Sequence, residues 1–362
     1  MTFESDFQII KNLTETQSCS GDESKIRNYI KEIVEPYCDK IETDILGNLF
    51  CFIYANAEGE EPKPKILLDA HMDEIGFIVR YIDNKGFIRF SPIGGQNPRI
   101  LPGQKVTIHS SSGEDILGII GELPIHLIKK EDRKKTIKME DLFIDIGMSS
   151  GDEVKKIISV GDYIVLTQEC IAFKGNKRIC SKSFDDRAGC FVLMKLLMEF
   201  ANIKEKLDKD LIFQFAAQEE IGVRGATVGA YKITPDIGIV VEVAHAIDFP
   251  GISKDKYHEC YLGSGVSIRI GPNLYPKLTK LLINTANEEK IPFVLIAEPR
   301  PTPTDARAIQ MTKSGIPCAL VATPLRYMHS NVEVIEYQDL IHTINLLKFF
   351  IMKDLKSLIR NE

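Results

Sequence analysis

Acidic residues and histidines stand at the ends of five apolar segments of this 362-residue chain. Charged side chains are rarely buried unless they are paired or bind a metal. In open α/β sheets, ligands bind beyond the carboxyl ends of the strands, so five such ends can converge on one crevice. The five stretches are "LLDAHMDE", "KSFDDRAG", "AAQEE", "IVVEVAHAID" and "PLRYMHS".

The residue types in these stretches suit metal chemistry. Two imidazoles and at least four carboxylates, without clustered thiols, favour zinc, manganese or cobalt. A two-metal hydrolytic site needs one carboxylate between the ions, a histidine and a carboxylate for each ion, and a free carboxylate for the attacking water. The chain supplies this set, but it has no HExxH motif. The fold must therefore bring distant ligands together.

His71 and the aspartate pair Asp185-Asp186 also have structural interpretations. His71 could be a hydrogen-bonded core histidine, but Asp73 is placed to orient its ring, which favours a metal ligand. Asp186 precedes a predicted helix and suits its N-cap, so Asp185 is the better ligand.

The remaining acids and histidines are weighed in the same way. Glu219 and Glu220 could lie in a solvated loop, although the apolar run before them argues against this. Glu242 could be an isolated paired acid, and His329 could belong to a polar surface turn. His245 is expected to be a nearby structural residue. The other histidines are expected to be ordinary surface or barrel residues, namely His109, His126, His258 and His342.

Composition excludes several classes of function. The net charge is −6 and no long basic stretch occurs, so nucleic acid is not an expected partner. No apolar run reaches the roughly 18 residues of a membrane span, and the N-terminus is not a signal peptide. Eight cysteines without a CxxC pair indicate reduced thiols in the cytoplasm. The absence of GxGxxG, Walker and GxSxG motifs leaves nucleotide binding and serine hydrolysis without support.

Hydrophobic patterning divides the chain into an α/β part and a β-rich insert. Strands alternate with helices over 1–73 plus 166–362, which predicts a mixed sheet flanked by helices. Between 74 and 165, short alternating strands and Gly/Pro turns predict a small inserted β-barrel. Strands are expected at 209–220, 235–246 and 318–326, and helices at 21–38, 186–201, 275–291 and 338–359.

At these residues the sequence resembles the glutamyl aminopeptidase, or TET aminopeptidase, family of dinuclear metallopeptidases (metallopeptidase family forty-two, also labelled endoglucanase-like). The resemblance runs from about residue 20 to residue 350. The matching stretches are "AHMDEIGFIV", "GFIRFSPIGGQNPRILPGQ", "EDLFIDIGMSS", "SFDDRAGC", "QEEIGVRGA", "IGPNLYPKL", "TDARAIQ" and "PLRYMHSNVEV".

The resemblance implies a zinc-peptidase-like catalytic domain at 1–73 plus 166–362. The inserted β-barrel domain at 74–165 would serve oligomerisation or substrate access. Two divalent ions per subunit are implied, with Zn²⁺ expected and Co²⁺ or Mn²⁺ as alternatives. Family members usually have Asp at the position of Glu242, whose side chain is one methylene longer. The implied metal ligands are His71, Asp185 between both ions, Glu220, Glu242 and His329, and the implied catalytic residues are Glu219 and Asp73.

The expected function is hydrolysis of the N-terminal residue of short peptides, with a metal-bridged water as nucleophile and Glu219 as general base. Asp305, Arg326 and Tyr327 are the expected substrate contacts. Arg224 and Arg326 could favour acidic substrates, but each could equally be a structural ion-pair partner. The family's shells of twelve subunits, built from dimers, imply a homo-oligomer.

Two other enzyme classes and a non-catalytic protein are weighed against this function. A metal-dependent deacylase or amidase could use the same centre. An endoglucanase is less favoured, because adjacent glutamates do not flank a sugar ring and the chain has no tryptophan. A non-catalytic descendant of an enzyme is disfavoured, because every expected ligand position is filled, with Glu242 as the one departure.

Overall fold

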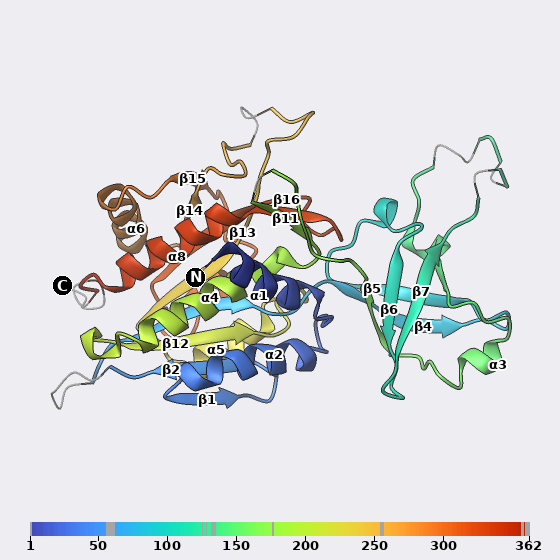
Figure 1. Cartoon of the computed structure of the whole chain (residues 1–362), viewed down its shortest axis with the longest axis horizontal. Coiled ribbons are helices and arrows are strands. Elements are labelled where there is room, and N and C mark those ends of the chain that lie inside the picture. The colour runs from blue at the N-terminus through green and yellow to red at the C-terminus, as the bar shows by residue number, and fades with distance from the viewer. Residues whose placement is uncertain are drawn as a thin grey trace.

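The computed structural model describes residues 2–55, 62–124, 126, 127, 129–131, 135–175, 177–253, 257–355 and 358. They form a layered α/β unit with a β-barrel at one side of it (Figure 1). The predicted fold class, a mixed sheet flanked by helices with an inserted β-barrel, is confirmed. Among the helices of these ranges, none combines the length and the apolar character that a membrane span requires.

A mixed sheet forms the centre of the α/β unit. Its main path runs through β1 (Lys40–Thr43), β2 (Leu49–Ile53), β12 (Asp210–Ala216), β3 (Lys65–His71), β13 (Ile237–His245), β16 (Cys318–Arg326), β17 (Glu333–Glu336), β11 (Arg178–Ser181) and β10 (Ile171–Ala172). A branch from β16 adds β14 (Val266–Ile270) and β15 (Phe293–Ala297). The four strands β12, β3, β13 and β16 run parallel to one another, so their carboxyl ends meet at one edge.

Helices cover both faces of this sheet. On one face, five helices contribute to the largest core, and α4 packs against β3 and β13. The other face carries a smaller core beneath two helices. The first group is α1 (Phe3–Glu15), α2 (Ser24–Val34), α4 (Phe184–Ala201), α6 (Pro276–Glu288) and α8 (Tyr337–Ile351), and the second is α5 (Arg224–Ile233) and α7 (Asp305–Gln310).

The two covered faces explain the sequence pattern of the central strands. β13 is buried continuously from Ile237 to Ala244, and β3 from Ile66 to His71. Parallel strands with helices on both sides read as continuous apolar runs, which is how both segments look in the sequence. A polar residue near the end of such a run therefore marks the edge of the sheet.

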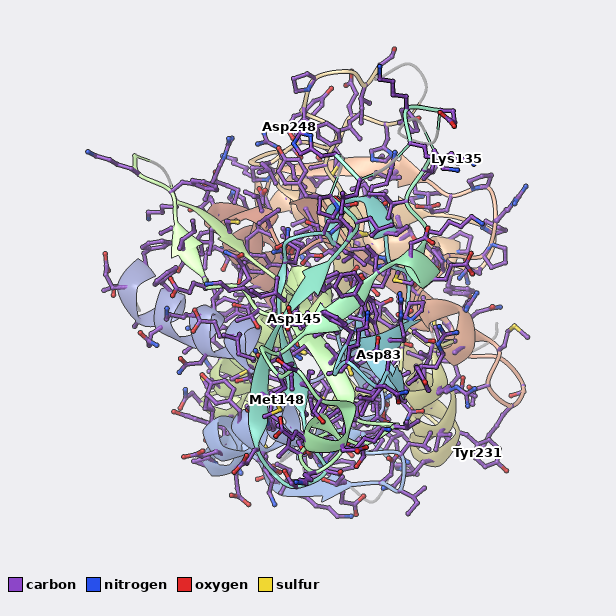
Figure 2. The ribbon with its side chains drawn as sticks, turned by 90° about the vertical axis from the view of Figure 1, so that its right-hand side faces the viewer. Asp83, Lys135, Asp145, Met148, Tyr231 and Asp248 are labelled. Carbon is purple, nitrogen blue, oxygen red and sulfur yellow. The ribbon has the colours of Figure 1, made fainter. Side chains whose placement is uncertain are left out.

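The barrel closes in the order β4 (Gly76–Ile82), β5 (Ile88–Ile93), β8 (Phe143–Asp145), β7 (Asp115–Gly121), β6 (Lys105–His109) and β9 (Tyr163–Leu166). Its interior is a separate hydrophobic core that includes Phe77, Phe90 and Ile164. One short helix, α3 (Gly151–Val154), follows β8. Figure 2 looks onto this barrel, with Asp83, Asp145 and Met148 on the side toward the viewer.

Several elements differ from the sequence expectation. No helix is predicted over α1, yet its N-terminus is stabilised by a capping box between Thr2 and Ser5. The predicted final helix, 338–359, ends at Ile351, where the ammonium of Lys209 donates to the carbonyls of Ile351 and Lys353. A lysine at this position stabilises a helix C-terminus. Of the predicted extension, residues 356, 357 and 359 lie outside the described part of the chain.

Candidate metal centre and catalytic site

The predicted metal ligands lie together beyond the carboxyl ends of the parallel strands. His71 is the last residue of β3, and Glu242 lies near the end of β13. Glu220 follows β12, and His329 follows β16. Asp185 lies at the start of α4, where it and Asp186 have non-helical backbone angles, so the regular turns begin after them.

Asp185 lies between the two histidines. Its Oδ1 atom is 3.0 Å from Nε2 of His71, and its Oδ2 atom is 3.3 Å from Nε2 of His329. Each histidine has a second carboxylate beside it. Oε1 of Glu242 is 3.7 Å from Nε2 of His71, and Oε1 of Glu220 is 3.4 Å from Nε2 of His329. Asp185 thus lies between two histidine–glutamate pairs, His71 with Glu242 and His329 with Glu220.

The two carboxylate oxygens of Asp186 have different environments. Its Oδ1 atom accepts a hydrogen bond of 2.9 Å from the N–H of Gly189, which is the predicted capping contact. Its Oδ2 atom is buried and has no hydrogen-bond partner in the described part of the chain. Asp186 also offers a ligand atom within 4.8 Å of ligand atoms of His71 and Glu242. It therefore adds an unsatisfied acceptor to the cluster.

Asp73 fixes the loop that carries the two glutamates. Its carboxylate accepts hydrogen bonds from the N–H groups of Glu219, at 3.0 Å, and Glu220, at 3.2 Å. The hydroxyl of Ser20 donates to it at 2.6 Å. Nδ1 of His71 lies 3.6 Å from Oδ1 of Asp73 and 3.1 Å from its carbonyl oxygen, so Asp73 also orients the imidazole.

Asn48 and Gly225 hold the same loop against the sheet. The side chain of Asn48 accepts from the N–H of Ala217 at 2.9 Å and donates to the carbonyl of Gly225 at 3.0 Å. A Cβ atom at residue 225 would lie 2.3 Å from both the Ala217 carbonyl and Asn48 Oδ1. Only glycine fits here, which is why the "QEEIGVRGA" stretch returns so closely to the end of β12.

Glu333 is a further acid of the site that the sequence reasoning missed. Its buried carboxylate accepts hydrogen bonds from the N–H of Asp185, at 3.2 Å, and from the N–H of His329, at 2.9 Å. Two of the predicted ligands are therefore held by one side chain. The sequence signal that could have identified Glu333 is an acidic residue between the apolar residues of "NVEVIEY".

The cluster has a strong excess of buried acid. Burial raises the pKa of Glu219 to about 10 and that of Glu242 to about 8, and neighbouring carboxylates add to both shifts. Although burial opposes it, hydrogen bonds to Asp185 and Glu220 raise the pKa of His329 to about 11. Hydrogen bonds from the two histidines outweigh burial and hold the pKa of Asp185 below its usual range.

This arrangement fits divalent cations. Carboxylates and imidazoles converge in a buried space, and one oxygen of Asp186 lacks any partner in the described residues. Within each of two groups, the possible ligand atoms lie within 4.8 Å of one another. The first group is His71, Asp185 and Glu220, and the second is His71, Asp186 and Glu242. Buried charges of one sign are stable only with compensating charge, which metal ions would supply.

A cavity of about 440 Å³ opens beside the cluster. Five predicted site residues contribute to its lining: Asp185, Glu219, Glu220, Glu242 and His329. His245 also lines it, and so does His258, one of the histidines expected at the surface or in the barrel. Nε2 of His258 donates to the carbonyl of His245 at 2.9 Å, which holds the ring at the cavity.

The three predicted substrate contacts do not line this cavity. Asp305 is buried against Asp69, and burial together with that neighbouring carboxyl holds the pKa of Asp305 well above its usual range. Arg326 makes a two-pronged ion pair with Asp248, the structural alternative weighed for it from the sequence. Tyr327 is half-exposed, and its ring packs near Phe249.

Comparison with known proteins places the chain in a family. The family model described as "M42 glutamyl aminopeptidase" matches residues 51–346. The lysyl aminopeptidase of Pyrococcus furiosus is 32% identical over 98% of each chain. A TET aminopeptidase structure from Thaumarchaeota archaeon SCGC AB-539-E09 has a TM-score of 0.91, with 32% identity over 98% of both chains.

A second solved structure, that of the TET1 peptidase of Pyrococcus horikoshii, also matches over nearly the whole chain. It has a TM-score of 0.83 at 26% identity, and the alignment covers 97% of this chain and 99% of that one. That peptidase can assemble into a tetrahedron or a large octahedral shell. From the matched family model and the full-length relatives, the chain belongs to the M42 glutamyl aminopeptidase family of hydrolases.

Proposed function

We propose that this protein is a dinuclear-metal aminopeptidase that removes the N-terminal residue of short peptides. The observation that carries the proposal is the position of Asp185, whose two oxygens lie beside two different histidines. His71, Asp185 and Glu242 would hold one ion, and Asp185, Glu220 and His329 would hold the other. Two such ions, Zn²⁺ above all and Co²⁺ or Mn²⁺ as alternatives, would lower the pKa of a water and polarise the scissile carbonyl.

Glu219 is the residue that moves the proton. Its carboxylate lines the cavity, and Oε2 is 4.0 Å from Nε2 of His71. It is not among the ligands assigned to the two ions above, so its carboxylate would remain free to act as a base. Glu219 takes a proton from the attacking water and gives it to the leaving amine. Asp73 supports this role by fixing the Glu219 backbone and the His71 ring.

The acidic lining also explains a preference for a free N-terminus. A peptide's α-ammonium group carries a positive charge, which cavity-lining carboxylates such as Glu219 and Glu220 would attract. A longer N-terminal extension would have to displace these groups. Cleavage is then restricted to the first residue of the substrate.

Glu242 is compatible with this centre despite its extra methylene. Its side chain folds back on its own backbone, where Oε2 accepts a hydrogen bond of 3.0 Å from the N–H of Val243. This bend takes up the additional length and leaves Oε1 beside His71. The departure from the usual aspartate therefore does not remove the ligand.

The proposal extends to the roles of the two domains, the oligomeric state and the location of the protein. Residues 1–73 plus 166–362 form the catalytic domain, and residues 74–165 form the barrel domain for oligomerisation or substrate access. The shells formed by the TET1 peptidase of Pyrococcus horikoshii support a dimer-built dodecamer for this chain. All eight cysteines are free, which supports the predicted cytoplasmic location.

A deacylase acting at the same centre is the second candidate, because its bond-breaking chemistry would be nearly the same. The similarity to solved structures of a TET aminopeptidase and of the TET1 peptidase favours the aminopeptidase. The test compares metal-reconstituted protein on aminoacyl-anilides and on N-acyl amino acids. Release of the aniline from aminoacyl-anilides, whose amino group is free, supports the proposal. Exclusive hydrolysis of the N-acyl compounds would establish the deacylase, and cellulose hydrolysis insensitive to chelators would establish the endoglucanase.

A further inference from the structure

The cavity beside the metal ligands contains one ion pair that the catalytic proposal does not use. Nη1 of Arg269, near the end of β14, donates to Oε1 of Glu298, which directly follows β15. Both residues line the cavity. The Arg269 side chain is only 11% exposed and that of Glu298 26% exposed, so the pair is held largely away from water.

The pairing of the strands places these two charges on the same sheet face as the metal ligand Glu242. Glu242 pairs with Ala322 of β16, and Ala322 pairs with Ser267 of β14. Arg269 lies two residues beyond Ser267 and therefore points to that same face. The ion pair is thus part of the wall that continues outward from the metal centre.

Apolar side chains supply much of the rest of this wall, beside His245, His258, Thr302 and Thr304. Val243, Ile296, Leu320, Ala322 and Met328 also line the cavity, and Ile296 pairs with Arg269 between β14 and β15. The cavity volume of about 440 Å³ is enough for a large side chain. A substrate side chain that enters this space can therefore contact both these apolar side chains and the ion pair.

The geometry points to Arg269 and Glu298 as the residues that set the side-chain preference of the site, and to peptides with an uncharged N-terminal side chain as its substrate class. This inference rests on the aminopeptidase function proposed above. With the ligand carboxylates compensated by metal, an acidic side chain would be attracted by Arg269 but repelled by Glu298. A basic side chain would be attracted by Glu298 but repelled by Arg269.

The energetic reason is that each charge already has its partner. A third charge brought into a partly desolvated pocket loses its water without gaining an unshared counter-charge. Apolar side chains such as those of leucine and methionine lose little and bury their surface against the wall.

The same reasoning predicts opposite effects for the two single substitutions. Glu298→Gln leaves Arg269 as an unpaired cation, so hydrolysis of glutamyl substrates should rise relative to leucyl substrates by about tenfold or more. Arg269→Gln leaves Glu298 as an unpaired anion, so lysyl substrates should gain by a similar factor. A merely structural ion pair would weaken the protein without moving the two preferences in opposite directions.

The experiment measures kcat/KM on leucyl-, methionyl-, glutaminyl-, glutamyl- and lysyl-anilides with the metal-reconstituted oligomer and both variants. The wild type should prefer the uncharged substrates over the charged ones by about tenfold or more. A wild type that prefers glutamyl or lysyl substrates, or variants that change all substrates equally, would overturn the assignment. No cleavage of any anilide by metal-loaded wild type would instead overturn the aminopeptidase function.

A matched control makes the same chemical change elsewhere. Glu288→Gln removes the carboxylate partner of Lys353 in an exposed ion pair at the end of α6, outside the cavity. Its substrate ranking should equal that of the wild type. If either cavity variant fails to fold, inhibition of the wild type by free leucine, glutamate and lysine decides the question. Strongest inhibition by leucine supports the inference, and strongest inhibition by either charged amino acid contradicts it.

Discussion

Glu219 and Glu220 are consecutive in the chain, but their carboxylates lie beside different histidines. Oε1 of Glu220 is 3.4 Å from Nε2 of His329, whereas Oε2 of Glu219 is 4.0 Å from Nε2 of His71. Both backbone N–H groups donate to Asp73, which holds the loop so that the side chains diverge. Two adjacent like charges can therefore have different chemical roles.

The substitution Glu219→Gln should leave metal binding intact and lower kcat by about 10²- to 10⁴-fold. The amide has nearly the same shape as the carboxylate, but it cannot accept the proton of the attacking water. Steady-state kinetics on a leucyl-anilide and elemental analysis of the same sample measure both quantities. Normal turnover in a variant that retains two ions would rule out Glu219 as the general base.

Two comparison variants sharpen this result. Glu220→Gln removes a predicted ligand and should lower the metal content as well as the activity, because a neutral amide binds a divalent cation less well than a carboxylate. Glu288→Gln changes an exposed glutamate of α6 and should alter neither quantity. Equal loss of metal in the Glu219 and Glu220 variants would contradict their separate roles.

The central strands, and the convergence of acids and histidines at their ends, were predictable from the sequence. β16 has the predicted bounds, and β13 differs by one or two residues at each end, because buried parallel strands appear as continuous apolar runs. The acids and histidines at the ends of such runs converge because parallel strands share one edge. His71 and Glu242 illustrate this, since their strands are direct neighbours in the sheet.

Other parts of the site depend on contacts that no local pattern reveals. Glu333 is buried because it binds the backbone of Asp185, which is 148 positions away in the chain. Arg269 and Glu298 are separated by 29 positions, and each reads in the sequence as a charge on a partly exposed strand. Only the pairing of β14 with β15 and β16 places them at the cavity.

Removal of the metal should make the protein less stable, and increasingly so as the pH rises from about 5 to 9. The folded metal-free protein holds extra protons, because the pKa values of Glu219, Glu242 and His329 are raised to about 10, 8 and 11. A state that binds more protons than the unfolded chain loses stability as the pH increases. Metal ions would replace these protons and remove the loss.

Thermal melts of chelated and reconstituted protein across this pH range measure the effect. The difference in Tm should widen toward alkaline pH, and metal at a thousand times its Kd should add about 4 kcal/mol per bound ion to the free energy of unfolding. Calorimetric titration in buffers of different ionisation enthalpy should show proton release on metal binding. A Tm that chelation does not change, with metal removal verified, would count against the proposed centre.

The substitution Glu333→Gln should weaken metal binding about 10- to 100-fold, the usual effect of losing a residue that orients ligands. Both carboxylate oxygens accept from backbone N–H groups of two proposed ligands, Asp185 and His329. An amide offers one acceptor and would present its NH₂ group to the other N–H. Competition with a chelator of known affinity measures the metal Kd without relying on activity.

Glu336→Gln is the matched control for this prediction. Glu336 ends the same strand, β17, but its partner is Arg178, so the metal Kd should stay at the wild-type value. Equal Kd values for the wild type and the Glu333 variant would show that the two hydrogen bonds do not position the ligands.

The substitution Lys182→Met should lower the free energy of unfolding by about 3–5 kcal/mol, because it leaves a buried carboxylate without its main partner. The ammonium of Lys182 lies 2.6 Å from both oxygens of Glu74, and both side chains are buried. Arg187 is 3.7 Å from the same carboxylate and cannot replace the two hydrogen bonds.

Urea denaturation of the metal-free protein measures this loss without a contribution from metal binding. Lys348→Met is the control, because it breaks an ion pair with Glu199 that is partly exposed and should cost at most about 1 kcal/mol. The double substitution Glu74→Met with Lys182→Met should recover much of the lost stability, since it removes the uncompensated charge together with its partner. If the double variant were as unstable as Lys182→Met, the cost would come from lost packing and not from the buried charge of Glu74.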